Sequence, residues 1–360
     1  MAISIFKDLI EELFQGVVLG QYERINGLPE APNYLHDQYL DSEYSVDMTY
    51  NSLSGDYTRI MADVVSFDSP LPIKSRGAIR SAAGSIPKIG VKYTLNEKEM
   101  NTLRILRNTP GRAVELARKV FADAESAMFG IKERLEQAFL LGLSSGVTLI
   151  SDADNAGLAV RIDYNVPAGN QSGVPVVWSD PAANIIDDIR ASIKTARNNG
   201  HTVRYLWMNA DTMANFYNNT QAKELFAFNQ NFVGVNVPQL DDAQVQSVLT
   251  RTLGIAGVIV VDRTFTEQKD ATKTITEGWT PNMVVLTTST QVGTLVYSTL
   301  AEEEFPQEHV QYAKPNDYIL ISKSGQDDPV SEKTMGQAIA FPILKDVESL
   351  YYIDTNTVEA

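Results

Sequence analysis

The chain has 360 residues, and its 30 lysines and arginines against 45 aspartates and glutamates give a net charge of −15. This length is enough for two or three domains with sizeable hydrophobic cores. The negative charge argues against a protein that wraps nucleic acid, because phosphate groups are neutralised by a basic surface. Cysteine is absent, which excludes disulfides, thiolate catalysis and cysteine-ligated zinc.

Residues 1–20 have the apolar spacing of an amphipathic helix. The apolar side chains that carry this spacing are Ile5, Phe6, Leu9, Ile10, Leu13, Phe14, Val17 and Val18. Glu11 and Glu12 interrupt the apolar run, so we expect neither a signal peptide nor a membrane-spanning helix here. The stripe can be buried on the helix's own domain or on a partner subunit, and the sequence leaves both open. Residues 21–50 are rich in carboxylates and tyrosines, which predicts an extended arm that lies on a surface.

A basic island follows within residues 59–100. Between Asp68 and Glu97 there is no carboxylate, whereas the interval contains Lys74, Arg76, Arg80, Lys88 and Lys92. Prolines and glycines exclude a helix over most of the island, so we predict a long two-stranded loop with a flexible tip. In an acidic protein such a loop is complementary to another copy of the same molecule. The alternative is a solvated loop without a partner.

The strongest local pattern predicts a long helix over residues 113–143. Its apolar stripe has the three-and-four spacing of one buried face, and consists of Val114, Ala117, Phe121, Ala124, Met128, Ile131, Leu135, Ala138 and Leu141. About 33 residues at 1.5 Å each give a rod of roughly 50 Å. Thr109 and Pro110 suit its beginning, and Gly142 and Gly146 its end.

After the long helix the pattern predicts a hairpin of residues 147–150 and 160–164. Helices and strands then alternate from 181 to 300, which predicts a compact α/β or α+β domain. Its expected elements are a helix from Asp180 and Pro181 to Gly200, a strand over 203–208, a helix over 210–218, and strands over 258–261 and 283–287. Late strands over 318–322 and 337–341 are expected to return to the domain of the long helix.

Two motifs suggest chemistry but fail in context. Residues 142–146 match G-x-S-x-G, yet a helix precedes Ser144 and a strand follows it, the reverse of a nucleophile elbow. Residues 152–157 with Asp163 resemble a calcium loop in part, but apolar runs flank the segment where helices should, and Ala156 occupies a ligand position. A helix end and a polar hairpin turn explain them better.

The remaining candidates are three histidines and one acidic cluster. His36, His201 and His309 lack metal-ligand spacing, so each is interpreted as a surface or hydrogen-bonded core residue. We therefore predict no catalytic, cofactor or metal site. Glu302, Glu303 and Glu304 either accept a basic loop from another subunit or form a solvated acidic turn. With the five cations of the basic island, these glutamates are the candidate subunit-interface residues.

The order of these parts resembles a tailed-phage major capsid protein with the HK97 fold, close to the lambda-type (phage capsid protein E) family. FDSPLP at 67–72 and IPKI at 86–89 resemble that family's approach to its E-loop and the return from it. Thr109 onward resembles its spine helix, and 143–164 the hairpin that follows. The opening of its A-domain resembles 180–203, and its closing strands resemble VVLTTSTQVGTLVY at 284–297 and the stretch 325–342 that ends in AIAFP.

The resemblance implies an α+β, HK97-like major capsid fold. Its expected parts are an N-terminal arm at 1–50, an E-loop region at 51–100, a peripheral domain with the spine helix at 101–180, an axial domain at 181–300, and return strands of the peripheral domain with the C-terminus at 301–360. Residues 1–50 and 51–100 are expected to reach neighbouring subunits.

The function implied is structural, without enzymatic activity or a cofactor. Subunits would form hexamers and pentamers of an icosahedral shell that encloses double-stranded DNA without reading its sequence. The protein would be assembled in the host cytoplasm, reside in the virion and not contact a membrane. Because the spine begins near residue 109, a large scaffold domain has no room before it, so a separate scaffolding protein is expected. A portal is also expected, and a decoration protein is left open.

Some shells of this fold are crosslinked by a lysine and an asparagine. Lys74, Lys88, Lys92 and Asn356 are the residue types available, but no motif marks them as reactive, and we predict no crosslink. Two alternatives come from other classes of protein. One is a related nanocompartment shell that holds cargo protein, and the other is a hydrolase that acts through Ser144.

Overall fold

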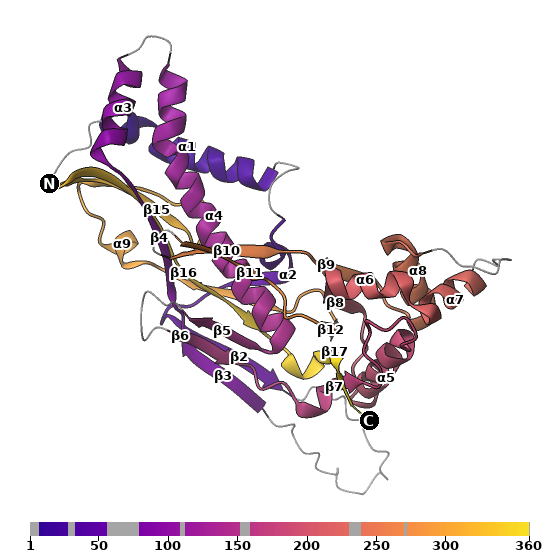
Figure 1. The fold of residues 1–360 in the computed structure, drawn as a ribbon. Helices are drawn as coiled ribbons and strands as arrows, with labels where there is room; N and C mark the ends of the chain where they lie inside the picture. The colour runs from indigo at the N-terminus through magenta and orange to yellow at the C-terminus, as the bar shows by residue number, and fades with distance from the viewer. Residues whose placement is uncertain are drawn as a thin grey trace, which may run out of the picture. The chain divides into compact units, whose positions relative to one another are not determined.

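The structure is a computed structural model, shown in Figure 1, and it describes residues 7–27, 33–55, 79–108, 112–151, 159–229, 239–269 and 272–359. The chain divides into two compact units. The first consists of residues 1–50, 84–137 and 294–343, and the second of residues 51–83, 138–293 and 344–360. No helix among the described residues is long and apolar enough to cross a membrane.

A six-stranded sheet forms the centre of the first unit. Along its main path lie β1 (Leu40–Tyr44), β13 (Gly293–Ser298), β16 (Val330–Leu344), β15 (Leu320–Asp327) and β14 (Val310–Ala313), and β4 (Lys88–Leu95) pairs with β16. The long strand β16 pairs antiparallel with both β15 and β4 over overlapping registers. The predicted late strands 318–322 and 337–341 therefore belong to one sheet, as β15 and β16.

The helices of the first unit confirm the long helix and correct the predicted arm. They are α1 (Lys7–Gly27), α2 (Leu35–Tyr39), α3 (Glu97–Arg107), the residues 113–137 of α4 (Ala113–Ser145), and α9 (Ala301–Glu304). Residues 21–50 are not simply extended, because α1 continues to Gly27, α2 follows, and β1 pairs with β13. The apolar stripe of α1 is partly buried in its own unit, with Phe14 and Val18 inaccessible to solvent.

The predicted stripe of the long helix is buried where the structure describes it. Phe121, Ala124, Met128, Ile131, Leu135 and Ala138 are all buried, and Leu141 is half-buried. The side chains of Val114 and Ala117, and residues Thr109 and Pro110, lie outside the description. The three-and-four spacing thus predicted the buried face correctly.

The second unit contains a five-stranded sheet with helices beside it (Figure 1). The strand order is β7 (Gln171–Val174), β17 (Tyr351–Val358), β12 (Met283–Thr287), β8 (Tyr205–Asn209) and β9 (Gly257–Val261). The helices are α5 (Ile185–Asn198), α6 (Ala210–Asn218), α7 (Thr220–Asn229) and α8 (Asp242–Leu253), with short 3₁₀ turns η1 (Ala168–Asn170) and η2 (Val347–Ser349). Side chains from α5, α6, α8 and the sheet share one buried core.

Three two-stranded ribbons complete the structure. They are β2 (Thr49–Gly55) with β3 (Ile79–Ser85), β5 (Val147–Ser151) with β6 (Ala159–Asp163), and β10 (Thr264–Lys269) with β11 (Thr272–Glu277). The first contains residues 79–85 of the predicted loop as β3, but β2 precedes residue 59, and residues 88–95 of the predicted loop form β4 of the six-stranded sheet. Residues 56–78 lie outside the described residues. The second confirms the hairpin after the long helix. The third was not predicted.

Close packing of α4 on the sheet depends on a glycine in β16. A Cβ atom built on Gly336 would lie 2.9 Å from Cβ of Ala127 and 3.2 Å from both its carbonyl oxygen and Ile321 Cδ1. These are atoms of a helix backbone and a buried core, which have little room to move. In the neighbouring strand β4, a Cβ atom on Gly90 would approach nothing closer than 3.4 Å.

We predict that Gly336→Ala lowers the free energy of unfolding by about 1–3 kcal/mol, because the added methyl overpacks the contact with α4. Gly90→Ala is the matched control, since both substitutions reduce the freedom of the unfolded chain equally. Chemical denaturation of the two variants measures the difference. Equal midpoints for both would show that α4 does not pack tightly at this position.

Candidate functional site

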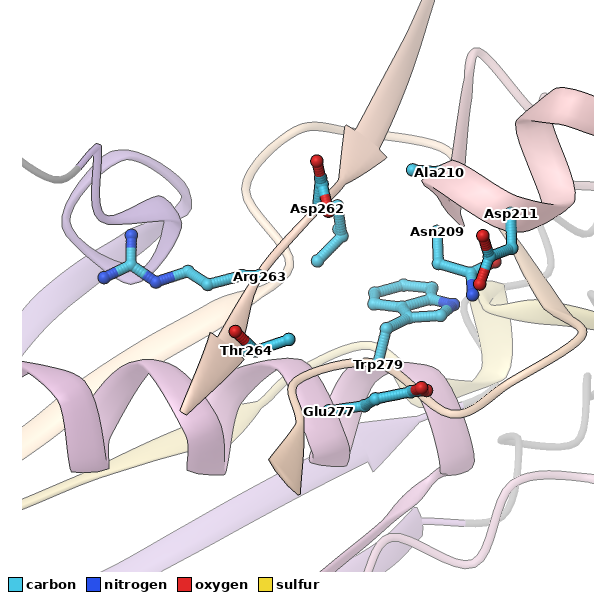
Figure 2. A pocket seen from close by; sticks show the side chains of 9 residues that line it. Asn209, Ala210, Asp211, Asp262, Arg263, Thr264, Glu277 and Trp279 are labelled. Carbon is cyan, nitrogen blue, oxygen red and sulfur yellow. The ribbon is translucent and has the colours of Figure 1, made fainter. Parts of the chain in front are cut away.

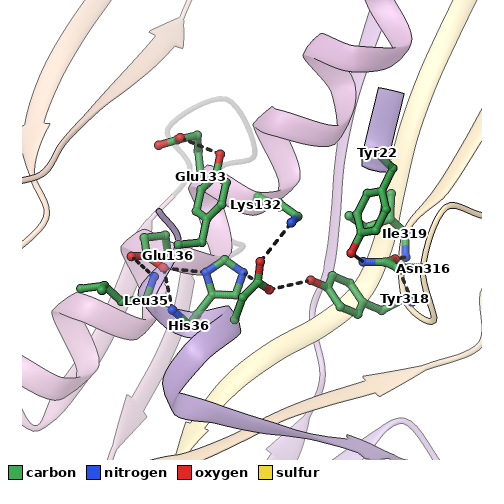
Figure 3. Close-up of polar contacts among 11 residues, drawn as sticks. Tyr22, Leu35, His36, Lys132, Glu133, Glu136, Asn316, Tyr318 and Ile319 are labelled. Carbon is green, nitrogen blue, oxygen red and sulfur yellow. Dashed lines mark hydrogen bonds and ion pairs between the residues drawn. The ribbon is translucent and has the colours of Figure 1, made fainter. Parts of the chain in front are cut away.

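The start of α2, at Leu35 and His36, is held on α4 by the buried carboxylate of Glu136 (Figure 3). Glu136 Oε1 accepts a hydrogen bond from Leu35 N at 2.9 Å, and Oε2 accepts one from His36 N at 2.9 Å. The His36 ring nitrogen Nδ1 lies 2.6 Å from the same Oε2, and both side chains have no exposed surface. Glu136 thereby satisfies the amide groups that begin α2, which lack partners within the helix.

Charged and aromatic groups extend this network across the unit. Asp37 Oδ2 lies 3.0 Å from Lys132 Nζ, and Asp37 Oδ1 lies 3.3 Å from Nε2 of His36. Tyr318 donates a hydrogen bond to Asp37 at 3.4 Å. Burial, with the negative charge of Asp37, raises the pKa of Tyr318 well above its ordinary range, so the hydroxyl remains a donor. The Lys132 ammonium also lies 4.9 Å from the centre of the Tyr22 ring.

This network is the main feature that the sequence analysis missed. Its members come from α1, α2, α4 and the segment before β15. Tyr318 and Asp37, which are hydrogen-bonded, lie 281 positions apart along the chain. A signal was present, because Lys132 and Glu136 lie four positions apart and directly follow Ile131 and Leu135, at the edge of the predicted buried stripe. Charged groups within a buried stripe require partners.

We predict that Glu136→Ala costs about 3 kcal/mol or more, because it leaves two amide groups and the His36 ring without their buried acceptor. Hydrogen exchange of residues 33–39 should speed up more than exchange elsewhere in the unit. Glu125→Ala is the control, since it removes an exposed pair between Arg24 and Glu125 on the same helix and should cost less than 1 kcal/mol, roughly the upper value for exposed pairs. Equal exchange in both variants would contradict the anchoring role.

A second buried ion pair lies between α4 and the sheet. Lys323 Nζ is 3.6 Å from Oε2 of Glu332, and it donates to Val120 O and to Thr334 Oγ1, each at 3.1 Å. Burial lowers the pKa of Lys323, and the nearby carboxylates counteract this in part. Asp123 lies in the same electrostatic environment. Burial, with a smaller contribution from Glu99, raises the pKa of Asp123 above its ordinary value although Lys323 opposes the shift.

A raised folded-state pKa means that folded Asp123 holds its proton at higher pH than the unfolded chain does. Its contribution to stability is therefore greatest below the unfolded value of 3.8 and is lost as the pH rises through the folded value. We predict that Asp123→Asn raises the melting temperature at pH 7 and that this gain vanishes below pH 3.8. Asp317→Asn, at an exposed position, should show no such gain, and a pH-independent gain for Asp123→Asn would contradict the assignment.

The candidate subunit-interface residues are only partly brought together. Lys88 Nζ lies 3.2 Å from Glu302 Oε1 in the same chain, and Lys314 Nζ lies 2.6 Å from Glu303 Oε2. Burial raises the pKa of Glu302, but hydrogen bonds from its own backbone, from Lys88 and from Gln337 outweigh burial and leave the pKa below its ordinary value. Glu304 is exposed. Two of the three glutamates therefore already have a cation from their own chain.

For the other cations of the basic island, the structure shows no contact with the three glutamates among the described residues. Lys92 is exposed in β4, at the position paired with Met335. Arg80 belongs to β3, but its side chain lies outside the description, as do Lys74 and Arg76 entirely. The structure thus brings together Lys88 and Glu302, and leaves the remaining contacts of the island as predictions.

The motifs set aside on sequence grounds have structural roles where they are described. Ser144 is buried near the end of α4, and its hydroxyl lies 2.9 Å from Thr280 Oγ1. The strand β5 follows it, so the reversed context is confirmed. Residues 152–158 lie outside the description, and strands flank them. Among the residues with described placement, no group of acidic or histidine side chains could hold a metal ion.

The histidines also fit the structural interpretation. His36 is a hydrogen-bonded core residue, and His201 Nδ1 lies 2.7 Å from the hydroxyl of Tyr351. His309 is exposed.

A small pocket lies where the parallel strands β8 and β9 end (Figure 2). It has a volume of about 110 Å³, and its lining includes Asp211, Asp262, Glu277 and the buried Trp279. Figure 2 shows the Arg263 side chain pointing away from it. No histidine, serine or cysteine lines it, so its titratable acid groups are the carboxylates of Asp211, Asp262 and Glu277.

The fold is that of HK97-like phage capsid proteins. A prophage protein of Escherichia coli CFT073, described as a capsid protein, is similar with a TM-score of 0.59 and 14% identity, over 94% of this chain and 98% of that chain. A chain of the capsid of cyanophage A-1(L) is similar with a TM-score of 0.54 and 12% identity, over 92% of this chain and 95% of that chain. A phage-related protein of Bordetella bronchiseptica RB50 has a TM-score of 0.51 and 11% identity, with 96% and 97% covered.

The family model for phage major capsid protein E matches residues 21–354, and the chain belongs to this family. It is a structural protein of a phage capsid shell, and the match favours this function over a cargo-holding nanocompartment. No curated protein sequence matches the chain. The predicted family and fold class are thereby confirmed.

Proposed function

We propose that this protein assembles into hexamers and pentamers that form an icosahedral shell around double-stranded DNA. The observation that carries the proposal is the family match, which spans nearly all of both units. Head-to-tail contacts close into rings when the rotation between subunits allows it. Many moderate contacts then suffice, because a closed shell multiplies each of them.

The shell is assembled with other proteins and holds DNA. A separate scaffolding protein directs assembly in the host cytoplasm, a portal occupies one vertex, and the DNA is held without sequence recognition. The net charge of −15 supports weak contact between the shell and its DNA. The protein has no enzymatic activity of its own.

Within this shell, the basic island contacts a neighbouring subunit through Lys74, Arg76 and Arg80. In each subunit, Glu302 already pairs with Lys88 and Glu303 with Lys314. The cations of the loop therefore bind Glu304 and other carboxylates of the neighbouring subunit. Contacts of this kind weaken as salt screens the charges.

We predict that the purified full chain, alone or with its scaffolding protein, forms closed shells, tubes or sheets in negative-stain microscopy. Arg76→Glu with Arg80→Glu should lower shell yield at low salt, where wild-type assembly is most favoured by charge. Lys194→Glu with Arg251→Glu, at exposed positions on α5 and α8, makes the same change in net charge as a control. Normal shell yield from the loop variant would contradict the loop contact, and monomers under all conditions would contradict the proposed function.

A further inference from the structure

Strand β11 is an exposed sheet edge that is rich in threonine and isoleucine. It is the second strand of the two-stranded ribbon with β10, and among the described residues no strand pairs with its other edge. All its residues except Thr276 are exposed, and Ile275 has 71% of its surface accessible. Four of its six residues are threonine or isoleucine, which favour strand structure. Such an edge is a template for pairing with another chain.

The base of this ribbon is anchored in the second unit. Phe265 of β10 is 4% exposed, and Gly278 N donates to Arg263 O at 2.9 Å. A Cβ atom on Gly278 would lie 2.6 Å from the Phe265 ring and 3.3 Å from Leu140 Cδ1. The registers from Thr264 with Glu277 to Lys269 with Thr272 continue without a bulge. The fixed base therefore presents the outer edge of β11 in a defined conformation.

The sequence of β11 is complementary to itself in one arrangement. If two copies pair antiparallel with Ile275 opposite Ile275, Lys273 of each copy lies opposite Glu277 of the other, and Thr274 lies opposite Thr276. Because side chains alternate along a strand, Lys273, Ile275 and Glu277 share one face. Opposite charges and β-branched pairs directly across a strand pair stabilise it.

Other arrangements of the same edge are unfavourable. Parallel pairing in register places Lys273 opposite Lys273 and Glu277 opposite Glu277, and like charges in that position destabilise. Lys273 and Glu277 of one strand do not pair with each other, since they are four positions apart, a distance of about 13 Å along the strand. Within the described part of the chain neither has an ion-pair partner. The charges thus select one orientation and one register.

We propose that β11 is a self-association strand that pairs antiparallel with β11 of a second copy across a two-fold axis. This contact is isologous, with the same residues on both sides. The inference rests on the proposed shell function, because the shell supplies the second copy. The contact would join two subunits across a two-fold axis, unlike the head-to-tail contacts that close a ring. The paired ribbons form a continuous four-stranded sheet, more stable than two isolated ribbons.

Cysteine crosslinking tests the contact directly, because the natural chain has no cysteine. In Ile275→Cys, Cys at position 275 of one chain lies opposite the same residue of the other chain. Their Cα atoms are then about 4.5–5.5 Å apart, a separation at which the two thiols can form a disulfide. Thr266→Cys is the matched control, since Thr266 is exposed and pairs with Ile275 on the same face of the ribbon. Its Cα atoms in two copies would be about 14 Å apart, too far for a disulfide.

We predict that mild oxidation of assembled particles converts Ile275→Cys, but not Thr266→Cys, to covalent dimers on non-reducing gels. Adding Lys273→Glu to Ile275→Cys should slow dimer formation about tenfold, because both cross-strand pairs become repulsive. Adding Glu277→Lys as well should restore the rate, since the pairs are then reversed and attractive again.

The outcomes separate this inference from the proposed function. Shells that form normally but yield no Ile275→Cys dimer, or equal dimer from both cysteine variants, would overturn the β11 contact while the shell function stands. Failure of the double charge exchange to restore the rate would overturn the proposed register. If the wild-type chain forms no particles, the shell function fails, and oxidation of the soluble Ile275→Cys chain still decides whether β11 pairs.

Discussion

The first unit depends on the burial of charged side chains on α4. Lys132 and Glu136 have at most 1% of their surface exposed, and a buried charge without a partner is strongly destabilising. Their partners, Asp37 and the start of α2, belong to the N-terminal segment. An apolar helix face would accept many partners of similar shape, whereas this pattern of charges accepts one segment in one register. The anchoring therefore adds specificity to the packing of this segment, in which Tyr34 and Leu40 are also buried.

Regular elements could be predicted where a local pattern decided them. The stripe of α4 has one spacing over nine positions, and α6 coincides with its predicted range because Asn209 caps it. The helix α8 was missed although Asp241 and Gln244 form a capping box and Gly254 ends it with φ of 74°. The helix α3 has a narrow buried side, Met100 and Leu103, within a polar sequence. Such a helix has too few apolar residues for their spacing to reveal it.

The long-range contacts could not be predicted, for a physical reason. Strand β17 lies between β7 and β12 in the second unit, and β16 pairs with β4 more than 200 positions earlier. Pairing over such separations depends on tertiary packing, which a window of neighbouring residues does not contain. The same holds for the interface residues. Charge alone grouped Lys88 with the other cations of the island, but the fold places it against Glu302 of its own chain.

That internal pairing changes what charge can do between subunits. A cation held at 3.2 Å by a carboxylate of its own chain offers little to a neighbour, because its field is largely cancelled at a distance. Lys273 and Glu277 differ, since their spacing prevents pairing within the strand and is complementary to a second, antiparallel copy. For a shell built from one chain, the useful charges are those that the fold leaves unsatisfied in a pattern that the same chain can complete. A high net charge keeps subunits soluble and apart, so assembly has to rely on such local complementarity.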